Sequence, residues 1–152
     1  MINTTLCYIE EDDKYLMLHR TKKEGDLNRD KWIGIGGKFE DKESPFDCVR
    51  REMLEETGLT AGELSYRGIV TFISDRYPTE YMHLFVARDM TGTPVVSCPE
   101  GELAWIKKSE LLTLTLWEGD KIFLRLLDEN VPFFSLKLEY EGDRLLAHTL
   151  EF

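Results

Sequence analysis

Cysteine is scarce in this 152-residue chain, and long apolar runs are missing. The three cysteines, Cys7, Cys48 and Cys98, are odd in number and lack the spacing of a metal site, so we expect reduced thiols in a cytosol. No stretch approaches the roughly 18 apolar residues of a membrane-spanning helix, and the N-terminus shows no basic start followed by an apolar run. These absences predict a soluble, cytoplasmic protein without a membrane partner.

Positive charge is also in short supply. The chain has 19 Lys and Arg residues against 29 Asp and Glu residues, for a formal net charge of −10. Non-specific binding to nucleic acid needs basic patches, so this balance argues against a nucleic-acid partner. Repeats, low-complexity tracts and linkers are absent as well. We expect a single domain, residues 1–152, that is long enough to bury a sizeable core.

What the chain does contain is a well-marked short helix. Ser44 is a preferred N-cap, Pro45 fits the first helical position, and Asp47 stands where a capping box needs its acid. Gly58 provides a left-handed C-terminal stop, with Leu59 to close the motif. About thirteen residues, or three and a half turns, are therefore predicted between the cap and the stop.

Carboxylates occupy one flank of this helix. At about 100° per residue, Glu52, Glu55 and Glu56 span an arc that adjoins the apolar face, and Glu56 projects beside Val49. Like charges at this spacing repel by a few tenths of a kcal/mol per pair on a free helix, and a divalent cation would offset that repulsion. The alternative interpretation is a solvated, glutamate-rich surface.

A fixed pattern around these glutamates favours the first interpretation. The sequence between Gly37 and Leu59 resembles the Nudix box, G-x5-E-x7-R-E-U-x-E-E-x-G-U, in which U is a bulky apolar residue. The matching residues are Gly37, Glu43, Arg51, Glu52, Met53, Glu55, Glu56, Gly58 and Leu59. The resemblance implies a Nudix hydrolase of MutT type, which uses Mg²⁺ and water to cleave a nucleoside diphosphate linked to another moiety.

The resemblance also implies a metal site. Mg²⁺ takes hard oxygen ligands and keeps several waters, so a few carboxylates together with substrate phosphates suit it, and Mn²⁺ is a possible substitute. Glu52 and Glu56 are implied as the central ligands. Glu55 and a backbone carbonyl at Gly36 or Gly37 are implied to help them.

Further polar residues are implied to act around the metal. The family uses different glutamates as the general base, and Glu55 and Glu100 are the candidates here, with Glu100 also a candidate ligand. Arg51 and Glu43 resemble residues that hold the loop and orient the ligands.

A polyphosphate substrate of an acidic protein needs positive charge from the metal and from a few basic side chains. Lys22, Lys23 and Lys38 are candidates near the site, and an ordinary surface lysine is the alternative for each. Gly36 and Gly37 would let the backbone approach the substrate closely.

Residues outside the box must determine the substrate. Trp32, Trp117 and Asp120, with the aromatic C-terminal segment, resemble the Nudix branch that hydrolyses oxidised purine nucleoside triphosphates. This implies that Trp117 stacks on the base, a contact that contributes about 1–3 kcal/mol, while Asp120 reads the base edge. The alternatives are a packing role for Trp117 at a helix start and a first-turn acid at Asp120 that the helix dipole favours.

Two positions depart from the mammalian-type members of that branch. Ile33 stands where they have an asparagine, and Ile33 offers no hydrogen bond to a base edge. Gly119-Asp120 replaces a pair of aspartates. The Trp-Ile-Gly and Trp-Glu-Gly-Asp segments are more similar to bacterial MutX-like members.

The resulting functional hypothesis is sanitation of the nucleotide pool. We expect hydrolysis of 8-oxo-dGTP, or a related triphosphate, to the monophosphate and pyrophosphate. One alternative is a Nudix hydrolase of ADP-ribose, a nucleotide sugar or a dinucleoside polyphosphate. Others are a silent nucleotide-binding module and a protein-interaction domain, which the intact box disfavours. The expected partner is a small nucleotide, and the sequence leaves monomer and homodimer open.

Patterns along the chain predict an α/β fold. Strand-like segments lie at residues 4–9, 15–19, 68–74, 80–87 and 103–106, and a C-terminal hairpin at 133–140 and 144–150. Apolar spacing predicts a second helix at residues 116–128. Mixed strands with two main helices favour a Nudix-type α/β/α sandwich, with helices on both faces of a mixed β-sheet.

Overall fold

The centre of the molecule is a mixed β-sheet. The computed structural model describes residues 1–22 and 25–152, and within these ranges nine strands form one sheet. The strand order is β6-β7-β2-β1-β5-β4-β8-β9, and β3 pairs with β2 off this path. The strands are β1 (Ile2–Glu11), β2 (Lys14–Arg20), β3 (Trp32–Ile33), β4 (Thr60–Ser74), β5 (Glu80–Thr91), β6 (Ser97–Cys98), β7 (Gly101–Lys107), β8 (Phe134–Glu141) and β9 (Arg144–Glu151).

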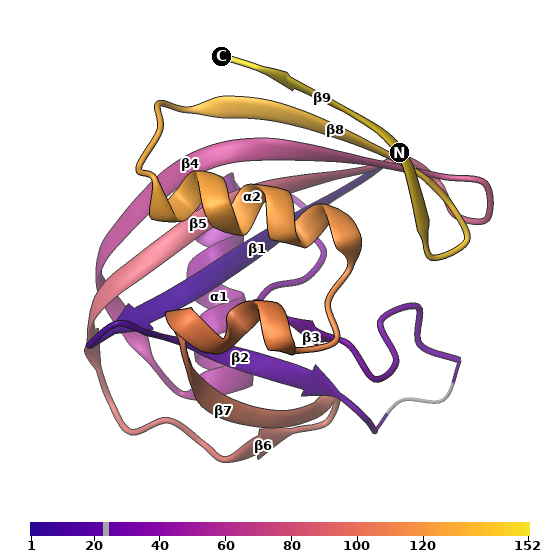
Figure 1. Cartoon of the computed structure of the whole chain (residues 1–152). Coiled ribbons are helices and arrows are strands. Elements are labelled where there is room, and N and C mark those ends of the chain that lie inside the picture. Colours follow the sequence, from indigo (N-terminus) through magenta and orange to yellow (C-terminus); the bar gives the residue numbers. More distant parts are fainter. Residues whose placement is uncertain (23–24) are drawn as a thin grey trace.

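Two of the strand pairs are parallel. β1 runs parallel to β5 and β4 runs parallel to β8, whereas β1 with β2, β4 with β5 and β8 with β9 are antiparallel. The mixed sheet predicted from the sequence is therefore confirmed (Figure 1).

The two helices cover opposite faces of the sheet. In Figure 1, α2 (Glu118–Asp128) lies in front of the sheet and α1 (Pro45–Thr57) lies behind it. Each helix has its own apolar cluster, with Met53 of α1 packing near Phe85, and Phe123 of α2 packing near Tyr8. The predicted α/β/α sandwich is confirmed. In the described ranges, no helix is long and apolar enough to cross a membrane.

The boundaries of α1 follow the predicted caps. The Ser44 side chain accepts a hydrogen bond from the Asp47 amide at 3.1 Å, and the Asp47 carboxylate accepts one from the Ser44 amide at 3.0 Å. Gly58 ends the helix with a φ of 76°, which glycine adopts without strain. The helix has 13 residues, as the sequence predicts.

The second helix starts later than predicted. Residues 116 and 117 lie outside α2, and Trp117 is its N-cap with extended backbone and no side-chain cap bond. The hydroxyl of Tyr140 on β8 accepts a hydrogen bond from the Gly119 amide at 2.7 Å instead. A tertiary contact thus satisfies the helix start, which local sequence could not show. The 3₁₀ helix η1 (Lys108–Thr113), which precedes this region, was not predicted.

Several strands differ in length from the prediction. Residues 68–74 form only the second part of β4, and a bulge between Tyr66 and Gly68 shifts the pairing with β5 just before them. The first part of β4 is mostly half-exposed or exposed, so its apolar pattern is weak. β3 and β6 have two residues each and are too short for a periodic signal. The terminal hairpin of β8 and β9 is confirmed.

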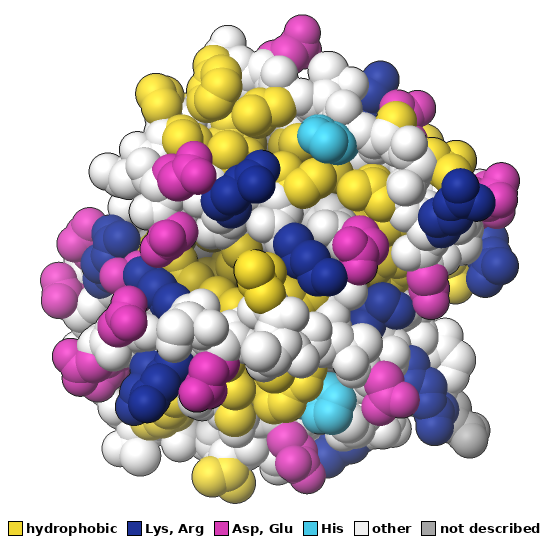
Figure 2. Space-filling view, viewed as in Figure 1, with side chains coloured by type: hydrophobic (Ala, Val, Ile, Leu, Met, Phe, Trp, Pro, Cys, Tyr) yellow, Lys and Arg dark blue, Asp and Glu magenta, His cyan; other side chains and the backbone are white. Residues whose placement is uncertain are grey.

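The surface around α2 carries mixed charge. On the face shown in Figure 2, Lys and Arg side chains lie among Asp and Glu side chains, with apolar side chains between them. Lys121 pairs with Glu118 at 3.0 Å, and Arg125 lies 4.0 Å from Glu129. These exposed pairs are typical of a solvated helix surface.

Candidate active site

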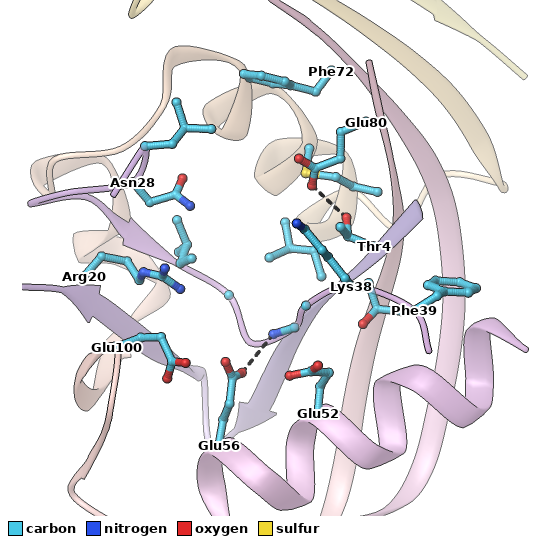
Figure 3. A pocket seen from close by; sticks show the side chains of 18 of the residues that line it. Thr4, Arg20, Asn28, Lys38, Phe39, Glu52, Glu56, Phe72, Glu80 and Glu100 are labelled. Carbon is cyan, nitrogen blue, oxygen red and sulfur yellow. Dashed lines mark hydrogen bonds between the residues drawn. The ribbon is translucent and has the colours of Figure 1, made fainter. Parts of the chain in front are cut away.

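The described residues enclose a cavity of about 620 Å³. β1, β2, β4, β5, α1, the start of α2 and the segment 34–38 contribute to its wall. We call the region of Glu52, Glu56 and Glu100 its carboxylate end, and the region of Asn28, Trp117 and Asp120 its tryptophan end. Figure 3 shows the three glutamates across the cavity from Asn28 and Phe72.

The glycine segment carries the backbone into the carboxylate end. It lies antiparallel along β1, through bridges of Thr4 with Lys38 and Cys7 with Ile35. A Cβ atom at Gly36 would lie 1.8 Å from the Thr5 carbonyl oxygen. The backbone at Gly36 therefore lies too close to β1 for a side chain.

Gly37 allows a carboxylate to sit against the backbone. A Cβ atom at this position would lie 2.6 Å from Oε1 of Glu52. The Gly37 carbonyl accepts a hydrogen bond from the Thr5 amide at 2.9 Å and therefore points toward β1. The Gly36 amide instead donates to Oε2 of Glu56 at 3.1 Å. The Gly36 amide thus faces the glutamates, while the Gly37 carbonyl is engaged by β1.

The carboxylates at this end disfavour one another's charge. Glu56 is 7% exposed, and its burial, followed by the charges of Glu52 and Glu100, raises its pKa to about 8. Burial also raises the pKa of Glu52, with Glu55 and Glu100 adding to the effect and Arg51 opposing it. A cation at this end would reverse these shifts, because it favours the ionised form.

Arg51 braces the loop against the helix. Its guanidinium donates to both carboxylate oxygens of Glu43, at 2.7 and 2.9 Å, and to the Lys38 carbonyl at 3.0 Å. These bonds lower the pKa of Glu43 to about 2, with a backbone hydrogen bond from Glu40 contributing next. The same guanidinium reaches Glu52 at 2.9 Å, so it positions a carboxylate of the cavity.

The two candidate general bases lie in different surroundings. The Glu55 side chain is 58% exposed, bonds to Arg51 at 3.2 Å and is not among the described residues that line the cavity. Glu100 is half-buried and lines the cavity. Figure 3 shows the carboxylate of Glu100 between Arg20 and Glu56.

The tryptophan end combines an aromatic ring with a buried acid. Trp117 is 5% exposed, and it packs edge-on against Phe72 and Tyr140 at ring distances of 5.5 and 5.1 Å. Burial raises the pKa of Asp120 to about 8, against the opposing charge of Lys31. The Lys31 amine lies 4.3 Å from the Trp117 ring centre. A pKa above neutrality favours the protonated carboxyl group of Asp120 at pH 7, and that form can both donate and accept.

Comparison with known proteins identifies the family. The NUDIX domain model matches residues 2–127 of the chain. This protein belongs to the Nudix family. It is 36% identical to the uncharacterized Nudix hydrolase YvcI of Bacillus subtilis (strain 168) over 120 residues, which are 76% of this chain and 72% of YvcI.

Two further Nudix relatives are similar over most of their length. The oxidized purine nucleoside triphosphate hydrolase of Mus musculus is 31% identical over 131 residues, 85% of this chain and 82% of the mouse protein. The crystal structure of the MutT protein from Bacillus halodurans superposes with a TM-score of 0.89 at 29% identity, covering 99% of this chain and 98% of that one. The chain is a Nudix hydrolase, an enzyme that hydrolyses pyrophosphate bonds in nucleotide substrates.

Nudix hydrolases generally use divalent metal ions such as Mg²⁺, and the carboxylate end suits one. Glu52, Glu56 and Glu100 supply hard oxygens whose mutual repulsion a cation would relieve. Within residues 1–22 and 25–152, no three Asp, Glu, His or Cys side chains are grouped closely enough to hold an ion unaided. An ion here would therefore complete its ligands with backbone oxygen, water and substrate phosphate.

The remaining predicted residues of the Nudix site are spread more widely. Trp32 stacks on His19 with ring centres 4.5 Å apart, and among the described residues its neighbour Ile33 lines the cavity while Trp32 does not. Lys38 lines the cavity with an exposed side chain. Lys22 instead donates to the Cys98 carbonyl at 3.3 Å. Lys23 lies outside the described residues.

The cavity also contains residues that the sequence analysis missed. Arg20 lines the carboxylate end and partly opposes the rise in the pKa of Glu56, and its guanidinium pairs with Asp26 at 2.6 Å. Glu80 lines the wall and accepts a hydrogen bond from Thr4 at 2.7 Å. Arg20 is the last residue of a mostly apolar strand, which is a usable signal for a strand-end site. Nothing in the sequence distinguishes Glu80 from a surface acid.

Proposed function

We propose that this Nudix hydrolase converts oxidised purine nucleoside triphosphates, 8-oxo-dGTP or a close relative, to the monophosphate and pyrophosphate. One observation carries the proposal: a single cavity contains the box carboxylates at one end and Trp117 with Asp120 at the other. A triphosphate suits the first end and a purine suits the second. The named activity of the mouse relative, at 31% identity, supports the same assignment.

The carboxylate end would hold Mg²⁺ through Glu52, Glu56 and the carbonyl of Gly36, with Glu100 close by. We choose Gly36 over Gly37 because the Gly37 carbonyl already accepts the Thr5 amide. The ion would neutralise phosphate charge and make a bound water more acidic. Arg51 keeps Glu52 oriented toward the cavity through its bond at 2.9 Å.

Glu100 is our candidate for the general base. It lines the cavity, whereas Glu55 is largely exposed and engaged by Arg51. A base must reach a water beside the substrate phosphates, so a carboxylate in the cavity wall is better placed. Glu100→Gln should therefore reduce kcat more than Glu55→Gln.

The tryptophan end would recognise the base. The Trp117 ring offers an apolar wall, and the neutral carboxyl of Asp120 can donate to a carbonyl or ring nitrogen and accept from an N–H group. Hydrolysis of an oxidised triphosphate would keep the damaged base out of DNA, and we place this activity in the cytoplasmic nucleotide pool.

A substrate panel tests the proposal. 8-oxo-dGTP, dGTP, ADP-ribose, a nucleotide sugar and a dinucleoside polyphosphate are compared by kcat/KM in Mg²⁺, with the products identified in ¹⁸O-labelled water. We expect 8-oxo-dGTP to be preferred, with monophosphate and pyrophosphate as products, and activity to vanish with chelator. Preference for ADP-ribose or a nucleotide sugar would overturn the substrate class while leaving the Nudix chemistry in place.

A further inference from the structure

Asn28 is a polar residue of the cavity wall that belongs to no part of the Nudix box. It lies in the loop between β2 and β3 and lines the tryptophan end. Its backbone is fixed on both sides, because its amide donates to Oδ1 of Asp26 at 3.1 Å and its carbonyl accepts from the Lys31 amide at 2.9 Å. The side chain therefore projects from a fixed point of the wall.

The orientation of the Asn28 amide follows from its contact with Trp117. The indole Nε1 of Trp117 donates to Oδ1 of Asn28 at 2.8 Å. An indole N–H can only donate, so the oxygen of Asn28 must face the tryptophan and its NH₂ group must face away. Figure 3 shows this nitrogen directed toward the cavity. In the described part of the chain, no group accepts a hydrogen bond from it.

At this end of the cavity the Asn28 NH₂ group and the Asp120 carboxyl group are both hydrogen-bonding groups, and apolar side chains lie beside them. Ile33 and Phe72 also line the cavity and offer the base edge no hydrogen bond. A site that presents a fixed donor favours a ligand with an acceptor and rejects one with a second donor, because both donors are then left unpaired. Guanine-type bases carry a carbonyl oxygen where adenine carries an amino group.

We propose that Asn28 is a specificity-determining residue that selects oxopurine triphosphates over adenine-type triphosphates through its side-chain N–H donors. This inference rests on the proposed function as a purine triphosphate hydrolase. It assigns the hydrogen bond that Ile33 of β3 cannot make to a residue of the preceding loop. The oxygen of the same amide, bound to Trp117, fixes the direction of the donors.

The test compares two substrates that share the 8-oxo group and differ in the base. kcat/KM is measured for 8-oxo-dGTP and 8-oxo-dATP in the full chain, Asn28→Asp and Asn28→Leu. Asn28→Asp keeps an acceptor oxygen for the Trp117 N–H and replaces the NH₂ donors with a second acceptor oxygen. Asn28→Leu removes the donors without adding charge. We expect the wild type to favour 8-oxo-dGTP and both variants to reduce that ratio about tenfold or more.

A charge control and a stability control accompany this test. Asn130→Asp adds the same charge at an exposed position after α2 and should leave the ratio unchanged. A purely structural role for Asn28 would lower the melting temperature and both kcat/KM values together, without changing their ratio.

The remaining outcomes of the substrate comparison contradict either the role of Asn28 or the proposed function. An unchanged ratio in both Asn28 variants, with both substrates hydrolysed, overturns the role of Asn28 and leaves the proposed function standing. A wild-type preference for 8-oxo-dATP also overturns the role of Asn28 and leaves the proposed function standing. Hydrolysis of neither substrate by the wild type overturns the proposed function and this inference with it.

Discussion

The two ends of the cavity each contain a buried carboxyl group with a pKa of about 8, and the causes differ. At Glu56, burial acts together with the charges of Glu52 and Glu100. At Asp120, burial raises the pKa and the neighbouring Lys31 opposes it. Burial is the largest cause at both groups, and the difference is that neighbouring carboxylates add to the rise at Glu56 whereas a neighbouring cation opposes it at Asp120.

This difference separates the chemistry of the two ends. A shift caused partly by like charges is reversed when a cation arrives, so Glu56 can become an ionised ligand at neutral pH. A shift caused by burial persists while the group stays dry, so Asp120 remains neutral. One carboxyl group is then suited to holding a metal, and the other to hydrogen bonding with an uncharged base.

The largest expected effect is at the carboxylate end. Glu56→Gln removes a charge and little volume, so kcat should fall at least about a hundredfold while the fold is retained. Steady-state kinetics with a Mg²⁺ titration measures this loss. Glu110→Gln, at an exposed position of η1, is the matched control and should be fully active. Full activity in Glu56→Gln would show that this residue is not a central ligand.

The same variant should change the stability of the metal-free protein. The pKa of Glu56 is raised in the folded state above its ordinary value of 4.5, so folding is favoured below that value and this contribution is lost as the pH rises through about 8. Glu56→Gln removes the titration and should flatten the fall in melting temperature across this range. If the melting temperature of Glu56→Gln falls with pH as steeply as that of the wild type, the raised pKa of Glu56 is contradicted.

At the tryptophan end, the expected effect is smaller and selective. Asp120→Leu should lower kcat/KM for 8-oxo-dGTP about ten- to hundredfold, since it removes a base-edge contact. Asp120→Asn keeps one donor and one acceptor, so most of the activity should remain. The wild type should lose its preference for 8-oxo-dGTP over dGTP as the pH rises above about 8, and Asp120→Asn should not.

The pH profiles of these two variants discriminate between the possible roles of Asp120. If Asp120→Leu leaves the ratio of 8-oxo-dGTP to dGTP hydrolysis unchanged and the protein is folded, Asp120 is only a first-turn acid of α2. If Asp120→Asn loses the preference at pH 7, the carboxyl group acts in its ionised form.

The smallest expected effect is at Arg51, which supports the carboxylate end from outside. Arg51→Lys cannot reproduce the two bonds to Glu43, so the free energy of unfolding should fall. Metal affinity should fall less than in Glu52→Gln. Denaturant unfolding and calorimetric Mg²⁺ titration measure the two quantities. Arg125→Lys, on the exposed face of α2, is the control. An equal loss of metal affinity in Arg51→Lys and Glu52→Gln would contradict the role of Arg51 in supporting Glu52.

The carboxylate end could be predicted from the sequence because it is mostly local. Ser44 and Gly58 mark the ends of α1, and the helix period then places Glu52 and Glu56 on one flank. The glycine segment is only a few residues upstream. The helix wheel also predicts that Glu56 lies at the edge of the core, and the structure shows it 7% exposed.

The tryptophan end was harder to predict because distant segments meet there. Asn28 and Trp117 are hydrogen-bonded across 89 positions, and no local pattern signals such a contact. Trp32 and Ile33 alternate in β3, and the side that faces the cavity depends on the pairing of β3 with β2. The sequence therefore indicated the residue types of this end without determining which of them line the cavity.

The most direct test of the contrast between the two ends is a pH titration of the side-chain carboxyl ¹³C signals of Glu56 and Asp120, with and without saturating Mg²⁺. We predict that both groups titrate near pH 8 without metal. With Mg²⁺, the pKa of Glu56 should fall below its ordinary range, while that of Asp120 should stay near 8. A Glu56 pKa that does not respond to Mg²⁺, or an Asp120 pKa that falls with it, would contradict the account.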